Sequence, residues 1–88
     1  MPRPLATVVL LAALAAPTAA LAQSASCNWY ADTALKQQQQ NEHRKCGFTG
    51  PEWSPSRQSH VSWCATQVPD NWKAMAQKRE QMLTGCKR

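Results

Sequence analysis

Hydrophobic side chains recur at the spacing of an α-helix in two stretches of the chain, and start and stop signals mark a third helix between them, which predicts three helices. The first predicted helix runs from about Asn28 to Lys45, and Gly47 lies just past its end, where a left-handed cap residue is common. The second half of this helix, KQQQQNEHRK (36–45), contains no hydrophobic residue. We therefore expect a solvated half-helix there, with disorder as the alternative. The positions that recur in the first half are Cys27, Tyr30 or Ala31, Ala34, Leu35 and Gln38.

A loop and a short helix are predicted next. Two glycines and two prolines interrupt the segment GFTGPEWSP (47–55), which is typical of a loop. Ser54 is the expected N-cap of the second helix, because proline is common at the first helical position and Pro55 follows directly. This helix should run to about Thr66, since Pro69 ends anything longer.

The third predicted helix has the clearest apolar stripe. We expect Asp70 to cap it, the helix to run from Asn71 to Thr84, and Gly85 to end it. Arg79 falls in the middle of the apolar stripe. The stripe consists of Trp72, Met75, Ala76, Met82, Leu83 and Cys86.

The N-terminal segment has the features of a signal peptide. Arg3 supplies a positive charge, an apolar run of twelve residues extends from Leu5 to Ala16, and small residues suited to cleavage follow at Ala20–Ala22. The apolar run is shorter than the roughly 20 residues that a membrane-spanning helix needs, which disfavours a retained signal anchor. We therefore predict a signal peptide over 1–22, a single domain over 23–88, and no transmembrane segment after cleavage.

Four cysteines, all after residue 22, predict how so small a domain is held together. A chain of this length buries too little apolar surface to be stable through its core alone, so a covalent or metal staple is needed. An even number of cysteines in an exported domain favours two disulfides. Metal ligation is the alternative, but the sequence has no C-x-x-C pair and no closely spaced pair of histidines. We expect two disulfides, no metal and no cofactor.

The positions of the cysteines on the predicted helices select one pairing among the three that are possible. Cys27 and Cys46 bracket the first helix, and nineteen residues at about 1.5 Å each place them about 28 Å apart, which no disulfide spans. Short connections favour antiparallel neighbours. We therefore predict an all-α fold, a small three-helix up-down-up bundle stapled by disulfides at both ends. The predicted pairs are Cys27–Cys64 and Cys46–Cys86.

The chain is mildly basic. Its net charge is +5 at pH 7, and +4 without Arg3 of the predicted signal peptide. This excess favours an acidic protein or an anionic component of the cell envelope as the partner. We expect no nucleic-acid partner, because an exported protein seldom meets nucleic acid.

The densest cluster of chemically versatile side chains is SHVSWCATQVPDNW (59–72). His60 and Cys64 are four residues apart and therefore share one helix face. A nucleophilic Cys–His pair needs a free thiolate, whereas Cys64 is expected in a disulfide. His43, the other histidine, lies near the opposite end of the predicted bundle, so a metal would lack a second imidazole. We expect a core histidine, with a ligand or general base as the alternative. Its expected neighbours are Tyr30, Ala31 and Trp72.

Tryptophan is frequent, with four in the chain. Most are expected in the core, because large aromatic side chains supply much of the burial in so thin a bundle. Trp53 is the expected exception, since it lies on the predicted loop, where an exposed indole suits stacking on a sugar or anchoring a partner. We therefore predict Trp53 as a weak binding residue.

Arg79 needs a polar partner, because an unpaired charge on a buried stripe is costly. The first and third helices run parallel in the predicted bundle, which places Arg79 level with Gln38 and Glu42. We expect a polar contact with one of these two residues, over the face of a tryptophan. Anion binding by the guanidinium is the functional alternative.

The remaining residues form no catalytic pattern. The five acidic side chains are scattered, and the sequence has no glycine-rich phosphate loop and no C-x-x-C redox motif. We therefore predict that the protein is not an enzyme and has no catalytic residue.

Four segments that each contain a cysteine are CNWYADTALKQQQQN, CGFTGPEW, HVSWC and REQMLTGC. Together they form the pattern C-x-x-Y-A…C-G-F-x-G-x-x-W…H-x-x-W-C…R-x-x-x-L-x-x-C, which spans Cys27 to Cys86. This pattern resembles a recurring, uncharacterised cysteine-framed segment of exported bacterial proteins. The resemblance implies a compact secreted unit and no particular activity.

These patterns predict a small, exported, non-catalytic binding or interaction module in the periplasm or outside the cell. One alternative is a cationic secreted antagonist or toxin-like effector that acts on an envelope. Another is a periplasmic carrier of a small ligand or metal that uses His60 and Arg79. The candidate binding residues are Trp53, His60 and Arg79.

Overall fold

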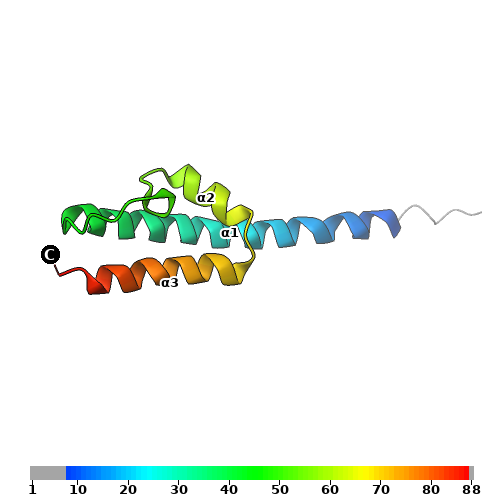
Figure 1. Cartoon of the computed structure of the whole chain (residues 1–88). Coiled ribbons are helices and arrows are strands. Elements are labelled where there is room, and N and C mark those ends of the chain that lie inside the picture. The colour runs from blue at the N-terminus through cyan, green and yellow to red at the C-terminus, as the bar shows by residue number, and fades with distance from the viewer. Residues whose placement is uncertain (1–7, 88) are drawn as a thin grey trace, which may run out of the picture.

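The structure is a computed structural model that describes the backbone of residues 8–87 and the side chains of residues 24–87. The chain forms a long helix α1 (Val8–His43), a 3-10 turn η2 (Pro51–Trp53), a short helix α2 (Arg57–Ala65) and a helix α3 (Pro69–Gly85). Both α2 and α3 pack against α1, with α2 running back along it and α3 parallel to it (Figure 1). The described residues contain no strand, so the predicted all-α, up-down-up bundle of three helices is confirmed.

The first helix begins well before the predicted Asn28, and its N-terminal part extends beyond α2 and α3 (Figure 1). The predicted signal peptide, 1–22, falls on this extension and on residues 1–7, which lie outside the described part of the chain. It stays a prediction. From residue 8 to residue 87, no helix combines the length and the apolar character needed to cross a membrane.

Two disulfides hold the bundle at opposite ends. Cys27–Cys64 joins α1 to the last turn of α2, with Cα atoms 5.5 Å apart. Cys46–Cys86 joins the segment after α1 to the residue after α3, with Cα atoms 5.8 Å apart. All four cysteines lie in the described part of the chain, and each of them is paired. Both predicted pairs are confirmed, because a continuous first helix keeps Cys27 and Cys46 too far apart to pair.

The C-terminal end of α1 is a Schellman motif, two residues earlier than the predicted cap. The backbone N–H of Cys46 donates to the carbonyl of Asn41 at 2.9 Å, and that of Lys45 donates to the carbonyl of Glu42 at 3.2 Å. Lys45 has a φ of 56°, so Lys45 is the left-handed cap of α1. Gly47 is also left-handed, with a φ of 81°, but it lies two residues after the cap, so the predicted cap position is wrong. The cap turns the chain out of α1 just before Cys46, which pairs with Cys86 after α3.

The substitution Lys45→Gly is expected to raise the free energy of unfolding by about 1 kcal/mol, because glycine adopts the left-handed conformation without steric cost. Lys36→Gly is the matched control, since Lys36 is exposed within α1 and glycine there should cost about 1 kcal/mol. Urea unfolding of the oxidised protein measures both changes. A lower midpoint for Lys45→Gly than for the wild type would contradict the assignment of the cap.

Helix α2 also begins later than predicted. Its N-cap is Ser56, whose hydroxyl accepts a hydrogen bond from the backbone N–H of Ser59 at 3.3 Å. The hydroxyl of Ser54 accepts from the N–H of Ser56 at 3.0 Å, and the carbonyl of Ser54 lies 2.7 Å from Nε2 of His60. The predicted cap at Ser54 is therefore wrong, because Ser54 belongs to a turn that the His60 ring holds in place.

Helix α3 begins at Pro69 with Val68 as its N-cap, so the predicted cap at Asp70 is wrong. Proline at the first helical position already has the φ of a helix, and this starts α3 before Asp70. Asp70 lies in the first turn instead, where its negative charge interacts favourably with the helix dipole.

The polar second half of α1 is partly buried, which the sequence pattern did not predict. Gln37 and Asn41 are each 4% exposed. The Asn41 side chain donates to the carbonyl of Phe48 at 2.8 Å and accepts from the N–H of Phe48 at 3.0 Å, so it holds the loop after α1 by two hydrogen bonds. The predicted solvated half-helix is wrong on this face, because Asn41 bonds the backbone of Phe48 and Gln37 bonds the carbonyl of Ala76 in α3.

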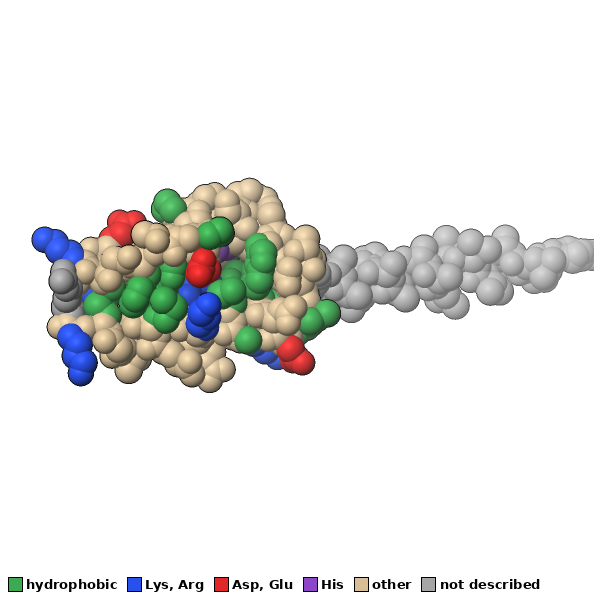
Figure 2. All heavy atoms as spheres, in the orientation of Figure 1, with side chains coloured by type: hydrophobic (Ala, Val, Ile, Leu, Met, Phe, Trp, Pro, Cys, Tyr) green, Lys and Arg blue, Asp and Glu red, His purple; other side chains and the backbone are tan. Residues whose placement is uncertain are grey.

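The apolar core surrounds the Cys27–Cys64 disulfide, between α1 and the two shorter helices. Figure 2 shows that hydrophobic side chains also reach the surface, in a band between α2 and α3 on the visible face. The buried members of the core are Cys27, Tyr30, Cys64, Trp72 and Ala76, with Trp63 and Met75 packed against them.

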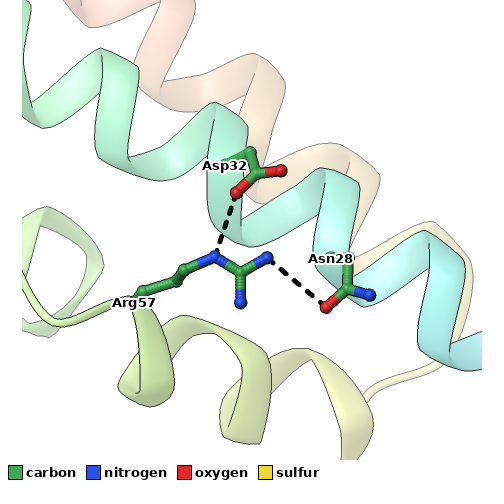
Figure 3. A network of polar contacts seen from close by, with 3 residues as sticks. All are labelled: Asn28, Asp32 and Arg57. Carbon is green, nitrogen blue, oxygen red and sulfur yellow. Dashed lines mark hydrogen bonds and ion pairs between the residues drawn. The ribbon is translucent and has the colours of Figure 1, made fainter.

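A surface contact orients the start of α2 on α1 (Figure 3). Nε of Arg57 donates to Asp32 at 3.0 Å, and Nη2 of the same guanidinium donates to the side-chain oxygen of Asn28 at 3.4 Å. The side chains of Arg57 and Asp32 are 45% and 59% exposed, so this ion pair contributes at most about 1 kcal/mol. Its effect is mainly to fix the direction of α2.

Candidate functional site

A hollow of about 190 Å³ opens where η2, α2 and α3 meet over α1. It is more enclosed than the shallow depressions beside Cys86 and beside His43. Its walls are mostly apolar, with a few polar groups among them. The lining residues are Tyr30, Pro51, Glu52, Ser59, His60, Trp63 and Met75.

Tyr30 is the centre of the aromatic cluster beneath this hollow, and it is only 1% exposed. Its ring centroid lies 5.5 Å from that of Trp63, at an interplanar angle of 33°. The rings of His60 and Trp72 each lie 6.2 Å from it, in edge-on arrangements. Because four rings from three helices meet here, the wall of the hollow is rigid before anything binds.

His60 is buried, as predicted, with 3% of its surface exposed and its ring against Tyr30. Its Nε2 lies 2.7 Å from the carbonyl oxygen of Ser54, so this nitrogen already makes a hydrogen bond with the turn before α2. Cys64, one helical turn away, is in a disulfide and supplies no thiolate. Among the described residues, no three His, Cys, Asp or Glu side chains lie close enough together to hold a metal ion.

Arg79 is completely buried, with 0% of its surface exposed. Its Nε donates to Oε1 of Gln37 at 2.7 Å, and its Nη1 donates to the hydroxyl of Tyr30 at 3.0 Å. The guanidinium carbon also lies 5.0 Å from the centroid of the Tyr30 ring. Nη2 has no hydrogen-bond partner. The cation is therefore held by neutral groups alone, which is a costly arrangement that polar partners only partly offset.

The partner of Arg79 differs from the predicted ones. Gln38 donates to Glu42 at 2.8 Å on the outer side of α1, and neither residue contacts Arg79. The aromatic face is that of Tyr30 and not of a tryptophan. Gln37 was missed, although its spacing from Ala34 and Asn41 places it on the buried stripe of α1. That spacing was the signal in the sequence.

The predicted exposure of Trp53 is wrong. Trp53 is 3% exposed, and its ring stacks on Phe48 with centroids 5.0 Å apart. The turn η2 directs the indole back against α1, because Gly50 before it adopts a φ of 119° that few other residues reach. The exposed large hydrophobic side chains are instead Trp29, at 54%, and Val68, at 61%.

Glu52 is a polar residue of the hollow that the sequence pattern did not single out. Its carboxylate makes no hydrogen bond and no ion pair within the described part of the chain, although its side chain is partly buried. A Cβ at Gly50 would lie 2.6 Å from Oε1 of Glu52, so the carboxylate folds back over the glycine. The hollow thus has an unpaired negative charge at its edge.

No family model matches the chain, and no curated protein or solved structure is significantly similar to it. The resemblance to a cysteine-framed exported segment stays a prediction. The fold and the hollow define a class of protein: a small helical domain held by two disulfides, with an aromatic-walled hollow on its surface.

Proposed function

We propose that the protein is a small, exported, non-catalytic binding module that holds a partner protein by one side chain inserted into the hollow. The size of the hollow carries this proposal. Its 190 Å³ is below the roughly 300–1,000 Å³ typical of small-molecule sites. A hollow of this size suits a single side chain better than a drug-sized ligand. Interfaces are commonly anchored by one side chain in a pocket.

The two disulfides support export as part of this proposal. Disulfides persist in oxidising compartments such as the periplasm and the extracellular space, and they are rare in the cytosol. The predicted signal peptide at 1–22 is consistent with the same route. We therefore propose that the oxidised domain meets its partner in the periplasm or outside the cell.

The arrangement of polar groups in the hollow supports a non-catalytic role. Ser59 and His60 both line it, but consecutive helical residues point about 100° apart, which disfavours a Ser–His pair. Nε2 of His60 is already bound to the carbonyl of Ser54. A nucleophile needs a base within hydrogen-bonding reach, and this geometry does not supply one.

The substitution Ser59→Trp tests the proposal, because an indole at this exposed lining position would fill the hollow. The expected result is a loss of about tenfold or more in partner binding, since the anchoring side chain can no longer enter. The measurement is crosslinking in intact cells, followed by quantification of the protein that the wild-type chain captures in the exported fraction.

Ser62→Trp is the matched control, because Ser62 is exposed on the same helix and does not line the hollow. It should capture the same protein at the wild-type level. Thermal unfolding of both variants checks that each of them is folded. Equal capture by the two variants, or no capture by the wild type, would overturn the proposal.

A further inference from the structure

We infer that the side chain received by the hollow is basic, an arginine or a lysine of the partner protein. Its aliphatic stem would lie against Trp63 and Met75, and its charged head beside the carboxylate of Glu52. This inference rests on the proposed function above, because it specifies what the hollow binds. It comes from three observations: Glu52 has no donor among the described residues, the walls of the hollow are mostly apolar, and Arg79 does not line the hollow.

Glu52 differs from the other acidic side chains of the domain. All five acidic residues lie in the described part of the chain, and Glu52 is the only one that is partly buried. Asp32 has Arg57 as its partner, whereas Glu52 has no donor at all among the described residues. A carboxylate that has lost part of its hydration without gaining a donor is unfavourable, and a cation placed beside it offsets that cost.

The walls of the hollow suit the stem of a basic side chain. Arginine and lysine bury their methylene groups along apolar surfaces while the charged end reaches a polar group. Trp63 and Met75 are partly exposed and supply such a surface, and an indole face also attracts a cation directly. The volume of the hollow, about 190 Å³, suits one such side chain.

Arg79 is the feature that argues for an acidic guest instead. Its Nη2 is an unpartnered donor, which an anion would satisfy. Arg79, however, has no exposed surface and does not line the hollow, and its charge is covered by Tyr30. Glu52 does line the hollow. Among the residues that line the hollow, Glu52 is the only aspartate, glutamate, lysine or arginine, although Lys78 lies near Trp63 and Met75 outside it, so the charge of the lining itself favours a cation.

Titration with small probes tests the inference without knowledge of the partner. The probes are the N-acetyl methylamides of arginine, citrulline and glutamate, added to the oxidised, 15N-labelled protein from the exported fraction. Citrulline matches the shape of arginine without its charge. The assigned indole N–H resonance of Trp63 reports binding. We expect saturable shifts with the arginine probe and about fivefold tighter affinity for it than for the citrulline probe, because only arginine forms an ion pair with Glu52. The difference is modest because solvent partly screens this ion pair.

Two variants assign the effect to Glu52. Glu52→Gln should bring the affinity for the arginine probe down to that for citrulline. Glu42→Gln, at an exposed acidic residue outside the hollow, should leave it unchanged. Equal affinities for arginine and citrulline, tighter binding of the glutamate probe, or no saturable shift with any probe would overturn the inference. The capture experiment with Ser59→Trp decides the proposed function separately, because it does not depend on the charge of the anchoring side chain.

Discussion

The double substitution Cys27→Ala and Cys64→Ala is expected to lower the free energy of unfolding by about 5 kcal/mol. The bridge joins residues 37 apart in the sequence, and a loop of this length is worth about 4 kcal/mol in the chain-entropy model. Both cysteines are buried, at 2% and 0% exposure, so lost packing adds about 1 kcal/mol. Small domains have total stabilities of about 5–15 kcal/mol, and the smallest lie at the low end. The variant should therefore be largely unfolded at 37 °C.

The other disulfide provides the matched comparison. Cys46→Ala with Cys86→Ala removes a bridge between residues 40 apart, so its entropic contribution is also about 4 kcal/mol. Because both of these cysteines are partly exposed, the packing loss is smaller, and this variant should be the more stable of the two. Urea unfolding followed by tryptophan fluorescence measures both. If the fully reduced protein unfolded at the same urea concentration as the oxidised one, the clamped bundle would be the wrong description of its stability.

The substitution Arg79→Met is expected to destabilise the protein by about 2–4 kcal/mol, although it removes a buried charge. Two effects oppose each other. Methionine relieves the desolvation of the guanidinium, but it leaves Oε1 of Gln37 and the hydroxyl of Tyr30 buried without their partner. Since an orphaned buried polar group costs about 1–3 kcal/mol, and two are created, the second effect should prevail.

A triple variant separates the two effects. Tyr30→Phe, Gln37→Met and Arg79→Met together remove the three side chains that these two hydrogen bonds join while keeping similar side-chain volumes, and the bond from Nε2 of Gln37 to the carbonyl of Ala76 is lost with them. Stability should return to within about 1 kcal/mol of the wild type, because replacing both sides of a buried polar contact by apolar groups is nearly neutral. Urea unfolding again gives the measurement. A triple variant as unstable as Arg79→Met would mean that the loss comes from packing and not from unpaired polar groups.

The type and approximate position of each helix followed from local patterns. Apolar spacing identified the first and third helices, prolines delimited the second, and prolines and glycines located the loop between the first two. The ends were less predictable. Ser54 and Asp70 are good capping residues, yet the caps are Ser56 and Val68, because the His60 ring binds the Ser54 carbonyl and Pro69 starts α3 early. A cap depends on contacts and turns that a single sequence pattern does not contain.

The candidate site could be predicted less well from the sequence pattern than the fold could. His60 was correctly expected in the core, since no partner for metal binding or catalysis stood near it. Trp53 was wrongly expected at the surface, because a loop position suggested exposure and the glycine-dependent turn before η2 could not be foreseen. Glu52 was not singled out from the sequence, because its lack of a hydrogen-bond donor depends on which residues the fold places around it.

The disulfide pairing was inherent in the chain, because the rise of a continuous helix excludes Cys27–Cys46, and the short connections favour antiparallel neighbours, which excludes Cys27–Cys86. The partner of Arg79 was not. Gln37 and Gln38 are chemically identical, and a rotation of about 100° on the helix settles which of them faces α3. The hollow likewise exists only once η2, α2 and α3 have met over Tyr30. Covalent geometry limits which cysteines can pair, whereas helix rotation and the meeting of distant segments depend on packing.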